Sequence, residues 1–182
     1  RSRLFIFSSP CNPSGSVYSK DELAALADVF RKHPNVFILS DEIYEYINFV
    51  GKHESIAQFE DLKDRIIIIN GLSKGYAMTG YRLGYIAAHP DVIKACEKLQ
   101  GQYTSGTNAV TQRGAIEALT GDLKPSVEMN KEFGRRRERM LQLLKAIPGI
   151  QIAEPDGAFY VFPVVTAYFG KKNGEEVIKD AD

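Results

Sequence analysis

Three short, uninterrupted apolar runs constrain the fold of this chain more than any other feature. They are Leu4 to Phe7, Val36 to Leu39 and Ile66 to Ile69. Strands that are buried on both faces carry such runs, because a parallel sheet is covered by helices on each side. The three runs therefore predict neighbouring strands of a buried sheet rather than an open sheet with one wet face.

The segment between the first two runs has the pattern of an amphipathic helix. Ser19 is a good N-cap and is followed by acidic residues in the first turn. Apolar side chains then recur at helical spacing as far as Phe30, and His33-Pro34-Asn35 ends the pattern. Strand, helix and strand in this order form a βαβ unit, so we predict the α/β class.

The rest of the sequence predicts two domains, a large α/β domain followed by the beginning of a smaller domain of another class. We expect a three-layer α/β/α domain with a mainly parallel sheet over residues 1–147, and the beginning of a small α+β domain over residues 148–182. The break at Pro148-Gly149 marks the boundary. The further elements that we expect are a strand at Leu83 to Ala88, helices from Pro90, from Asn108 to Leu119 and from Pro125 to about Ala146, and strands at Ile150 to Ala153 and Ala158 to Val165.

Composition excludes several classes of function. The 182 residues contain 23 Lys and Arg against 23 Asp and Glu, so we expect neither a nucleic-acid partner nor a polybasic membrane surface. The longest apolar runs are far shorter than the roughly 20 residues of a membrane span. Cys11 and Cys96 have no metal-ligand spacing and are expected to be free thiols. Free thiols fit a reducing compartment, so we expect a cytoplasmic protein without a metal site.

Polar side chains follow each of the three apolar runs. Since ligands bind beyond the carboxyl ends of the strands in open α/β sheets, neighbouring strands would collect these side chains in one crevice. The crevice would hold an amide, a carboxylate, a phenol, an amine and a guanidinium, which belong to Asn12, Asp41, Tyr44, Lys74 and Arg82.

Each of these residues has an ordinary interpretation when it is taken alone. Asn12 suits a turn, Asp41 could cap a helix, Tyr44 could simply pack, and Lys74 and Arg82 could be surface cations. Their combination is more specific. A desolvated lysine amine is a nucleophile, a carboxylate pairs with a protonated ring nitrogen, and a guanidinium fork fits a phosphate. Pyridoxal phosphate satisfies all three demands.

The motifs at these positions resemble those of a known family. Residues 8–15 read SSPCNPSG, residues 39–47 read LSDEIYEYI and residues 70–85 read NGLSKGYAMTGYRLGY. The chain resembles the class I and II aminotransferases of fold type I, and within them the bacterial aspartate aminotransferase branch. The resemblance extends through residue 182 and includes the PDGAFY stretch at 155–160, which typically enters the small domain.

The resemblance implies a role for each predicted site residue. Lys74 would form a Schiff base with pyridoxal phosphate and then move protons as general base and acid. Asp41 would keep the pyridine nitrogen protonated, and Tyr44 and Asn12 would bond the ring's phenolic oxygen. Arg82 would bind the phosphate, with Ser73 as a second contact. The implied reaction moves an amino group from an amino acid to a 2-oxo acid.

Some features depart from the family pattern. Many relatives carry serine three residues before the lysine, where this chain has Gly71, and Ser14 stands where threonine is usual. Family members run to roughly twice this length, so we expect a fragment that lacks segments at both ends. No arginine follows Arg139 to bind the substrate carboxylate. We therefore expect that the complete parent protein is a homodimeric enzyme, and that the 182-residue segment by itself is inactive.

The motifs leave other functions open. A C–S lyase or an enzyme similar to aminocyclopropane carboxylate synthase would use the same lysine chemistry. An aminotransferase-like effector domain of a transcription regulator would share the fold without catalysis.

Overall fold

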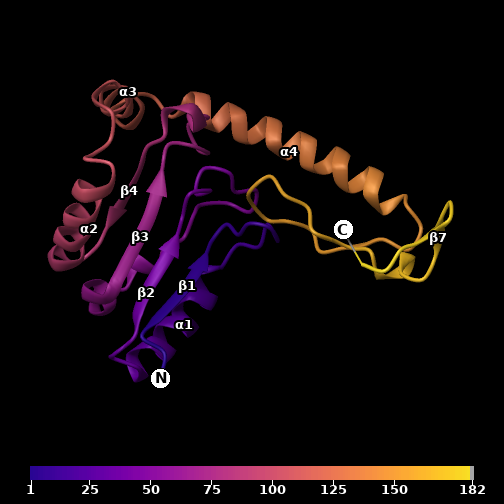
Figure 1. Ribbon diagram of the computed structural model, residues 1–182, viewed down its shortest axis with the longest axis horizontal. Helices are drawn as coiled ribbons and strands as arrows, with labels where there is room; N and C mark the ends of the chain where they lie inside the picture. Colours follow the sequence, from indigo (N-terminus) through magenta and orange to yellow (C-terminus); the bar gives the residue numbers. More distant parts are fainter. Residues whose placement is uncertain (181–182) are drawn as a thin grey trace.

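A four-stranded sheet forms the centre of the computed structural model, which describes residues 1–180. Strands β1 (Leu4–Ser8), β2 (Phe37–Asp41) and β3 (Ile66–Gly71) are parallel, and β4 (Gly84–Ala87) pairs antiparallel to β3. The strand order β1-β2-β3-β4 follows the chain (Figure 1). The predicted mainly parallel sheet is therefore confirmed, and the three apolar runs fall in β1, β2 and β3 except for Val36, which directly precedes β2.

Helix α1 (Lys20–Lys32) covers one face of this sheet. Its Ser19 N-cap and Glu22 form a reciprocal capping box, in which the Glu22 amide donates to Ser19 Oγ at 3.3 Å. Leu23, Ala27 and Phe30 of the helix are buried against the sheet. The remaining buried residues of this core come from β2, β3 and the segment between them, and they are Ile38, Ile56, Leu62 and Ile66. The predicted βαβ unit is thus formed.

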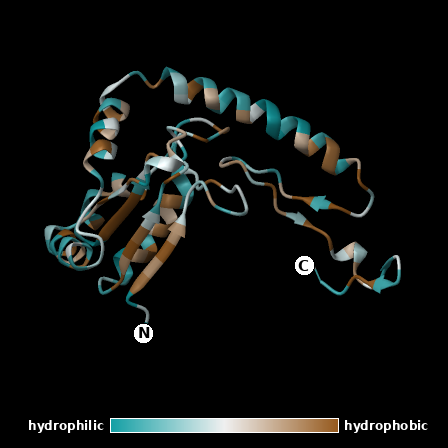
Figure 2. Cartoon of the chain, turned by 45° about the horizontal axis from the view of Figure 1, so that its top comes forward, coloured by the Kyte–Doolittle hydropathy of each residue, from teal (hydrophilic) through white to brown (hydrophobic). Residues whose placement is uncertain are grey.

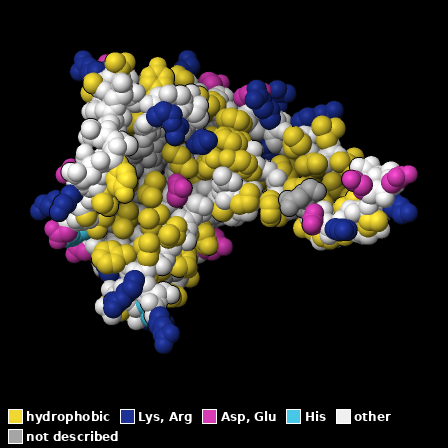
Figure 3. All heavy atoms as spheres, in the orientation of Figure 1, with side chains coloured by type: hydrophobic (Ala, Val, Ile, Leu, Met, Phe, Trp, Pro, Cys, Tyr) yellow, Lys and Arg dark blue, Asp and Glu magenta, His cyan; other side chains and the backbone are white. Residues whose placement is uncertain are grey.

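Among the described residues, the opposite face of the sheet leaves apolar side chains exposed. Because side chains alternate along a strand, Phe5 and Phe7 face α1 while Leu4 and Ile6 face the other way. Ile6 is 63% exposed and Phe37 is 41% exposed. Figure 3 shows hydrophobic side chains gathered over the strands on this face, and Figure 2 shows the strands as the most apolar part of the molecule.

Three further helices follow the sheet. Helices α2 (Pro90–Tyr103) and α3 (Ala109–Thr120) lie beyond the β4 edge (Figure 1). The helix expected from Asn108 is present as α3, and Asn108 is its N-cap, because its side chain accepts the Val110 amide at 2.8 Å. The long helix α4 (Lys124–Lys145) then runs across the molecule to the C-terminal part (Figure 1). No helix among residues 1–180 is both long and apolar enough to cross a membrane.

The described C-terminal part, up to residue 180, contains short strands and the 3-10 helix Thr166–Tyr168. Strands β5 (Gln151–Ile152) and β6 (Pro163–Val164) pair antiparallel, and β7 (Lys172–Asn173) pairs with β8 (Glu176–Val177). The prediction of a strand over residues 158–165 is wrong for residues 158–162. Ala158 has a φ of 57°, in the left-handed region, so the chain turns there instead of extending. Residues 181–182 of the predicted small domain lie outside the described residues.

Candidate active site

The carboxyl ends of β1, β2 and β3 meet at one edge of the sheet, as the parallel order requires. Backbone hydrogen bonds join the strands up to this edge. Ser9 N donates to Asp41 O at 3.1 Å, and Glu42 N donates to Ile69 O at 2.9 Å. An open cavity of about 280 Å³ lies at this edge, and Asp41, Ser73 and Arg82 all line it. The structure therefore brings a carboxylate, a hydroxyl and a guanidinium together around one space.

Lys74 and Tyr44 lie beside this edge. The Lys74 amine is 5.9 Å from the centre of the Tyr44 ring and 5.6 Å from the centre of the Phe159 ring. The turn that carries Lys74 packs closely on its neighbour, because a Cβ at Gly75 would lie 2.5 Å from the Tyr46 ring. The half-buried lysine is thus held among aromatic rings.

Tyr44 is buried and hydrogen-bonded. Its hydroxyl lies 2.7 Å from the Tyr160 hydroxyl. Burial raises the pKa of Tyr44 far above its ordinary value, and the bond to Tyr160 and the charge of Asp41 act in the same direction. The Tyr44 phenol therefore keeps its proton over the physiological range and can serve as a hydrogen-bond donor.

Arg82 occupies an unusual backbone position. Its φ of 54° lies in the left-handed region, at the end of the short 3-10 helix Thr79–Tyr81, and its Nη1 donates to Thr79 O at 2.9 Å. The side chain is exposed at the cavity, so the guanidinium is available to an anion. A non-glycine residue in this region marks a position where strain accompanies function in many proteins.

Gly71 is explained by packing at the end of β3. A Cβ there would lie 2.9 Å from Leu83 O and 3.0 Å from the Gly84 Cα. A serine at this position would have to push the paired strand β4 away. The hydroxyl at this edge comes instead from Ser73, which lines the cavity.

Asn12 is the predicted site residue that the structure places least firmly. It lies on the loop after β1, its side chain is exposed, and it does not line the strand-end cavity. The loop itself is closed by hydrogen bonds of 2.8 Å from Gly15 N to Cys11 O and 2.9 Å from Cys11 N to Ser16 O. The role of Asn12 stays a prediction.

The segment 155–160 completes the site by threading between two loops. Gly157 N donates to Gly15 O at 2.8 Å, and Ala158 N donates to Ile47 O at 2.7 Å. Neither contact leaves space for an extra carbon, because a Cβ at Gly15 would lie 2.2 Å from Pro155 and one at Gly157 would lie 2.7 Å from Pro10. Phe159 and Tyr160 are carried to Lys74 and Tyr44 by this threading.

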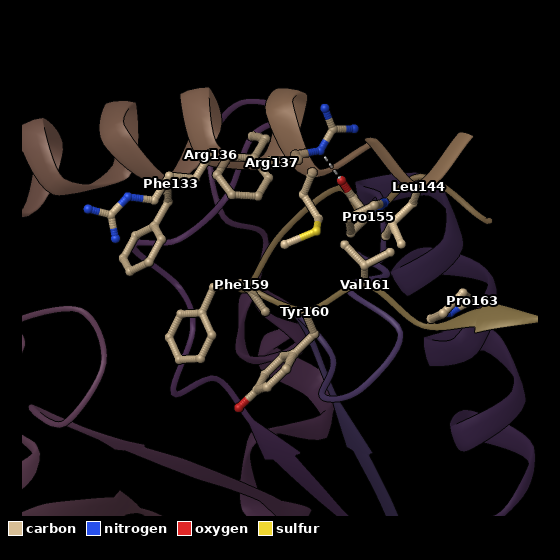
Figure 4. A pocket seen from close by; sticks show the side chains of 12 residues that line it. Phe133, Arg136, Arg137, Leu144, Pro155, Phe159, Tyr160, Val161 and Pro163 are labelled. Carbon is tan, nitrogen blue, oxygen red and sulfur yellow. Dashed lines mark hydrogen bonds between the residues drawn. The ribbon is translucent and has the colours of Figure 1, made fainter. Parts of the chain in front are cut away.

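An apolar cavity of about 450 Å³ lies on the other side of Phe159 and Tyr160. It lies between α4, residues 155–163 and Phe49 and is open to solvent. Figure 4 shows Phe133 directed from the helix into this region and Arg137 directed to the Pro155 oxygen. Arg137 Nε donates to Pro155 O at 2.5 Å. The Phe133 and Phe159 rings stack with centres 5.3 Å apart. This cavity is lined by none of the predicted site residues, but Phe159 and Tyr160, which contact Lys74 and Tyr44, belong to its wall.

Sequence reasoning missed Phe159 and Tyr160 as site residues. The PDGAFY stretch at 155–160 contributed to the family resemblance, but its apolar residues predicted only a strand and no role in the site. The contact between Tyr44 and Tyr160 joins residues 116 positions apart, so no local pattern predicts it.

Comparison with known proteins defines the class to which this fold and site belong. The sequence profile of the family "Aminotransferase class I and II" matches residues 1–179. The chain belongs to this family, and its fold is the α/β fold of these enzymes.

Particular relatives are aspartate aminotransferases. The chain is 43% identical to "Aspartate aminotransferase" of Bacillus subtilis (strain 168), over 90% of this chain and 42% of the relative. It is 41% identical to "Probable aspartate/prephenate aminotransferase" of Rhizobium leguminosarum bv. phaseoli, over 100% of this chain and 46% of the relative. The solved aspartate aminotransferase of Rhizobium meliloti superposes with a TM-score of 0.93 at 37% identity, over 98% of this chain and 46% of that one. The chain therefore spans less than half the length of the relatives that it matches.

Proposed function

We propose that this chain carries the cofactor-binding centre of a pyridoxal phosphate-dependent aminotransferase. The observation that supports it most is the placement of Asp41, Ser73 and Arg82 around one cavity with Lys74 beside it. A hydroxyl and a guanidinium suit a phosphate, and a carboxylate suits a protonated ring nitrogen. The donor set thus fits pyridoxal phosphate.

The residues would divide the work according to their chemistry. When bound, pyridoxal phosphate supplies an electron sink that stabilises negative charge at the substrate α-carbon. Lys74 would hold the cofactor as a Schiff base, and its amine would accept the proton from the substrate α-carbon and return it as a general acid. Arg82 and Ser73 would hold the phosphate. Asp41 would keep the ring nitrogen protonated, and Tyr44 and Asn12 would donate hydrogen bonds to the ring oxygen.

Substrates and assembly belong to the same proposal. The substrates would be an amino acid and a 2-oxo acid, and the names of the relatives favour aspartate as donor. The active protein would be a cytoplasmic homodimer, while residues 1–182 by themselves would be inactive. Residues 1–147 would form most of the large domain's second half, and residues 148–182 would begin the small domain.

The cofactor assignment is tested by the absorption of the complete natural protein that carries these residues. Pyridoxal phosphate should give a visible band that borohydride bleaches, with the reduced cofactor attached to the Lys74 peptide in mass spectrometry. Lys74→Ala should abolish the band. The control is Lys63→Ala, since the Lys63 side chain is exposed and pairs only with Glu60 among the described contacts. A band that survives Lys74→Ala would refute the role of the lysine.

The reaction type is tested by a panel of amino acids. Conversion of the bound cofactor to its pyridoxamine form, with release of the matching 2-oxo acid, would support an aminotransferase. Release of a thiol or of an aminocyclopropane product would indicate one of the related enzymes. No conversion with any amino acid would refute the proposal.

A further inference from the structure

A buried carboxylate lies directly behind the candidate active site and has no part in the reaction proposed above. Glu42 is 4% exposed, and its oxygens accept three hydrogen bonds. Ser40 Oγ donates at 3.0 Å and Ser55 Oγ at 2.7 Å to Oε1, while His53 Nε2 lies 2.9 Å from Oε2. We call these four side chains the Glu42 cluster.

The buried Glu42 carboxyl group has hydrogen-bond partners at both of its oxygens. A carboxylate removed from water is costly unless donors replace the lost hydration, and here three donors do so. Within residues 1–180, the buried Nδ1 of His53 has no hydrogen-bond partner. Because a carboxylate oxygen accepts, Nε2 is the ring nitrogen that carries a proton and donates to Glu42 Oε2. The ring then acts as a fixed donor to Glu42.

The strand geometry couples this cluster to Asp41. Side chains alternate across a strand, so Ser40 and Glu42 point to one side and Asp41 points to the other, toward the cavity. Glu42 also fixes the backbone at this point, since its amide donates to Ile69 O at 2.9 Å. The Ile43 amide donates to Asp41 Oδ1 at 3.1 Å and so reports directly on the orientation of that carboxylate.

Two residues of the segment between β2 and β3 complete the Glu42 cluster. His53 and Ser55 reach Glu42 from eleven and thirteen residues further along the chain. Ser55 Oγ also accepts the Ala57 amide at 3.2 Å, at the start of the short helix Ile56–Gln58 that packs in the core. The strand end is therefore anchored to the core through side chains rather than through backbone pairing alone.

We propose that Glu42 is a positioning residue, and that the Glu42 cluster sets the orientation of the Asp41 carboxylate toward the cofactor ring nitrogen. The inference rests on the proposed function for its consequence, because only a bound cofactor gives Asp41 a partner there. A loss of the cluster would loosen Asp41 while leaving Lys74 and Arg82 in place. Misplacement of such a group by about 1 Å can lower the rate by up to about a hundredfold.

The test uses Glu42→Gln and Ser55→Ala, with Glu60→Gln as the matched control. Glu60 is an exposed carboxylate that pairs with Lys63 at the surface. The first readout needs no cofactor: hydrogen exchange of the Ile43 and Glu42 amides should accelerate in both cluster variants and stay unchanged in the control.

A second pair of variants tests the donor from His53. His53→Ala removes this donor and should also accelerate exchange, whereas His53→Gln keeps an amide donor at similar reach and should retain most of the protection.

The second readout uses the complete natural protein loaded with pyridoxal phosphate. In Glu42→Gln we expect kcat to fall about ten- to hundredfold with a small change in KM, together with a shifted pH midpoint of the visible band. Should Glu42→Gln fail to fold, Ser55→Ala, which removes a single neutral donor, should show a smaller change in the same direction.

The outcomes separate the two proposals. A wild-type protein without a borohydride-sensitive band refutes the proposed function, while the exchange rates still decide whether the Glu42 cluster fixes Asp41. A folded variant with wild-type exchange at Ile43 and an unshifted pH midpoint overturns the positioning role, whatever its activity.

Discussion

Replacement of Gly157 by alanine tests how the C-terminal segment reaches the site. An alanine Cβ at this position would lie 2.7 Å and 2.8 Å from two side-chain carbons of Pro10 and 2.9 Å from Ile47 O. Carbon atoms normally touch at about 3.5–4.0 Å, so the new methyl group overlaps both neighbours. The backbone carbonyl cannot rotate away as a flexible side chain could. Gly157→Ala must therefore shift either the loop after β1 or the segment itself.

The expected loss follows from these contacts. Overpacking of this kind costs about 1–3 kcal/mol in the free energy of unfolding. If the segment moves away instead, the bonds from Ala158 N to Ile47 O and from Phe49 N to Asp156 O are lost, at about 1 kcal/mol each. Both routes give a loss of similar size, but only the second withdraws Tyr160 from Tyr44.

Urea denaturation and hydrogen exchange distinguish these routes. Both routes should lower the free energy of unfolding, but only withdrawal of the segment should speed hydrogen exchange at the Phe49 and Ala158 amides. The matched control is Gly101→Ala, because a Cβ at Gly101 meets no atom within 4 Å and that glycine lies inside helix α2. The control should be neutral or stabilising by up to about 1 kcal/mol. Unchanged stability and unchanged exchange in Gly157→Ala would refute the argument that close packing at this glycine holds the segment in place.

Three further changes test other parts of the fold. Ser19→Ala removes the cap of α1 and should lower the free energy of unfolding by about 1 kcal/mol in urea. Gly71→Ser should cost about 1–3 kcal/mol in the same assay, because its Cβ would press on the β4 backbone. Burial raises the pKa of Glu45, so the stability it contributes is complete below the ordinary carboxyl pKa and is lost as the pH rises through the raised value. Glu45→Gln should flatten the pH dependence of urea denaturation in that interval, and an unaltered slope would contradict this assignment.

The sequence predicts those elements whose signals are local. The apolar runs locate β1, β2 and β3, and Ser19, Pro90 and Asn108 mark where three of the helices begin. A cap or a buried run is recognisable from a few neighbouring residues, because its physical cause is a hydrogen bond or a burial pattern within that stretch.

The parts that the sequence does not predict depend on distant contacts. Residues 158–162 have the composition of a strand, but Ala158 turns with a positive φ because the chain is held between two loops. The pairing of Tyr44 with Tyr160 and the Glu42 cluster arise in the same way. His53 has no distinctive neighbours in the sequence, and only the fold brings it to Glu42.

The end of β2 shows why the candidate site needs both kinds of information. Asp41 is predictable because it follows a buried run, and a parallel sheet presents such residues at one edge. Its neighbours Ser40 and Glu42 follow the same run, yet the pleat directs them to the opposite side, where they meet His53 and Ser55. One strand end therefore presents one carboxyl group to the cavity and a second carboxyl group to the side chains behind the strand. If Asp41 and Glu42 act as we propose, the chemistry at the cavity depends on the first and the accuracy of its placement depends on the second.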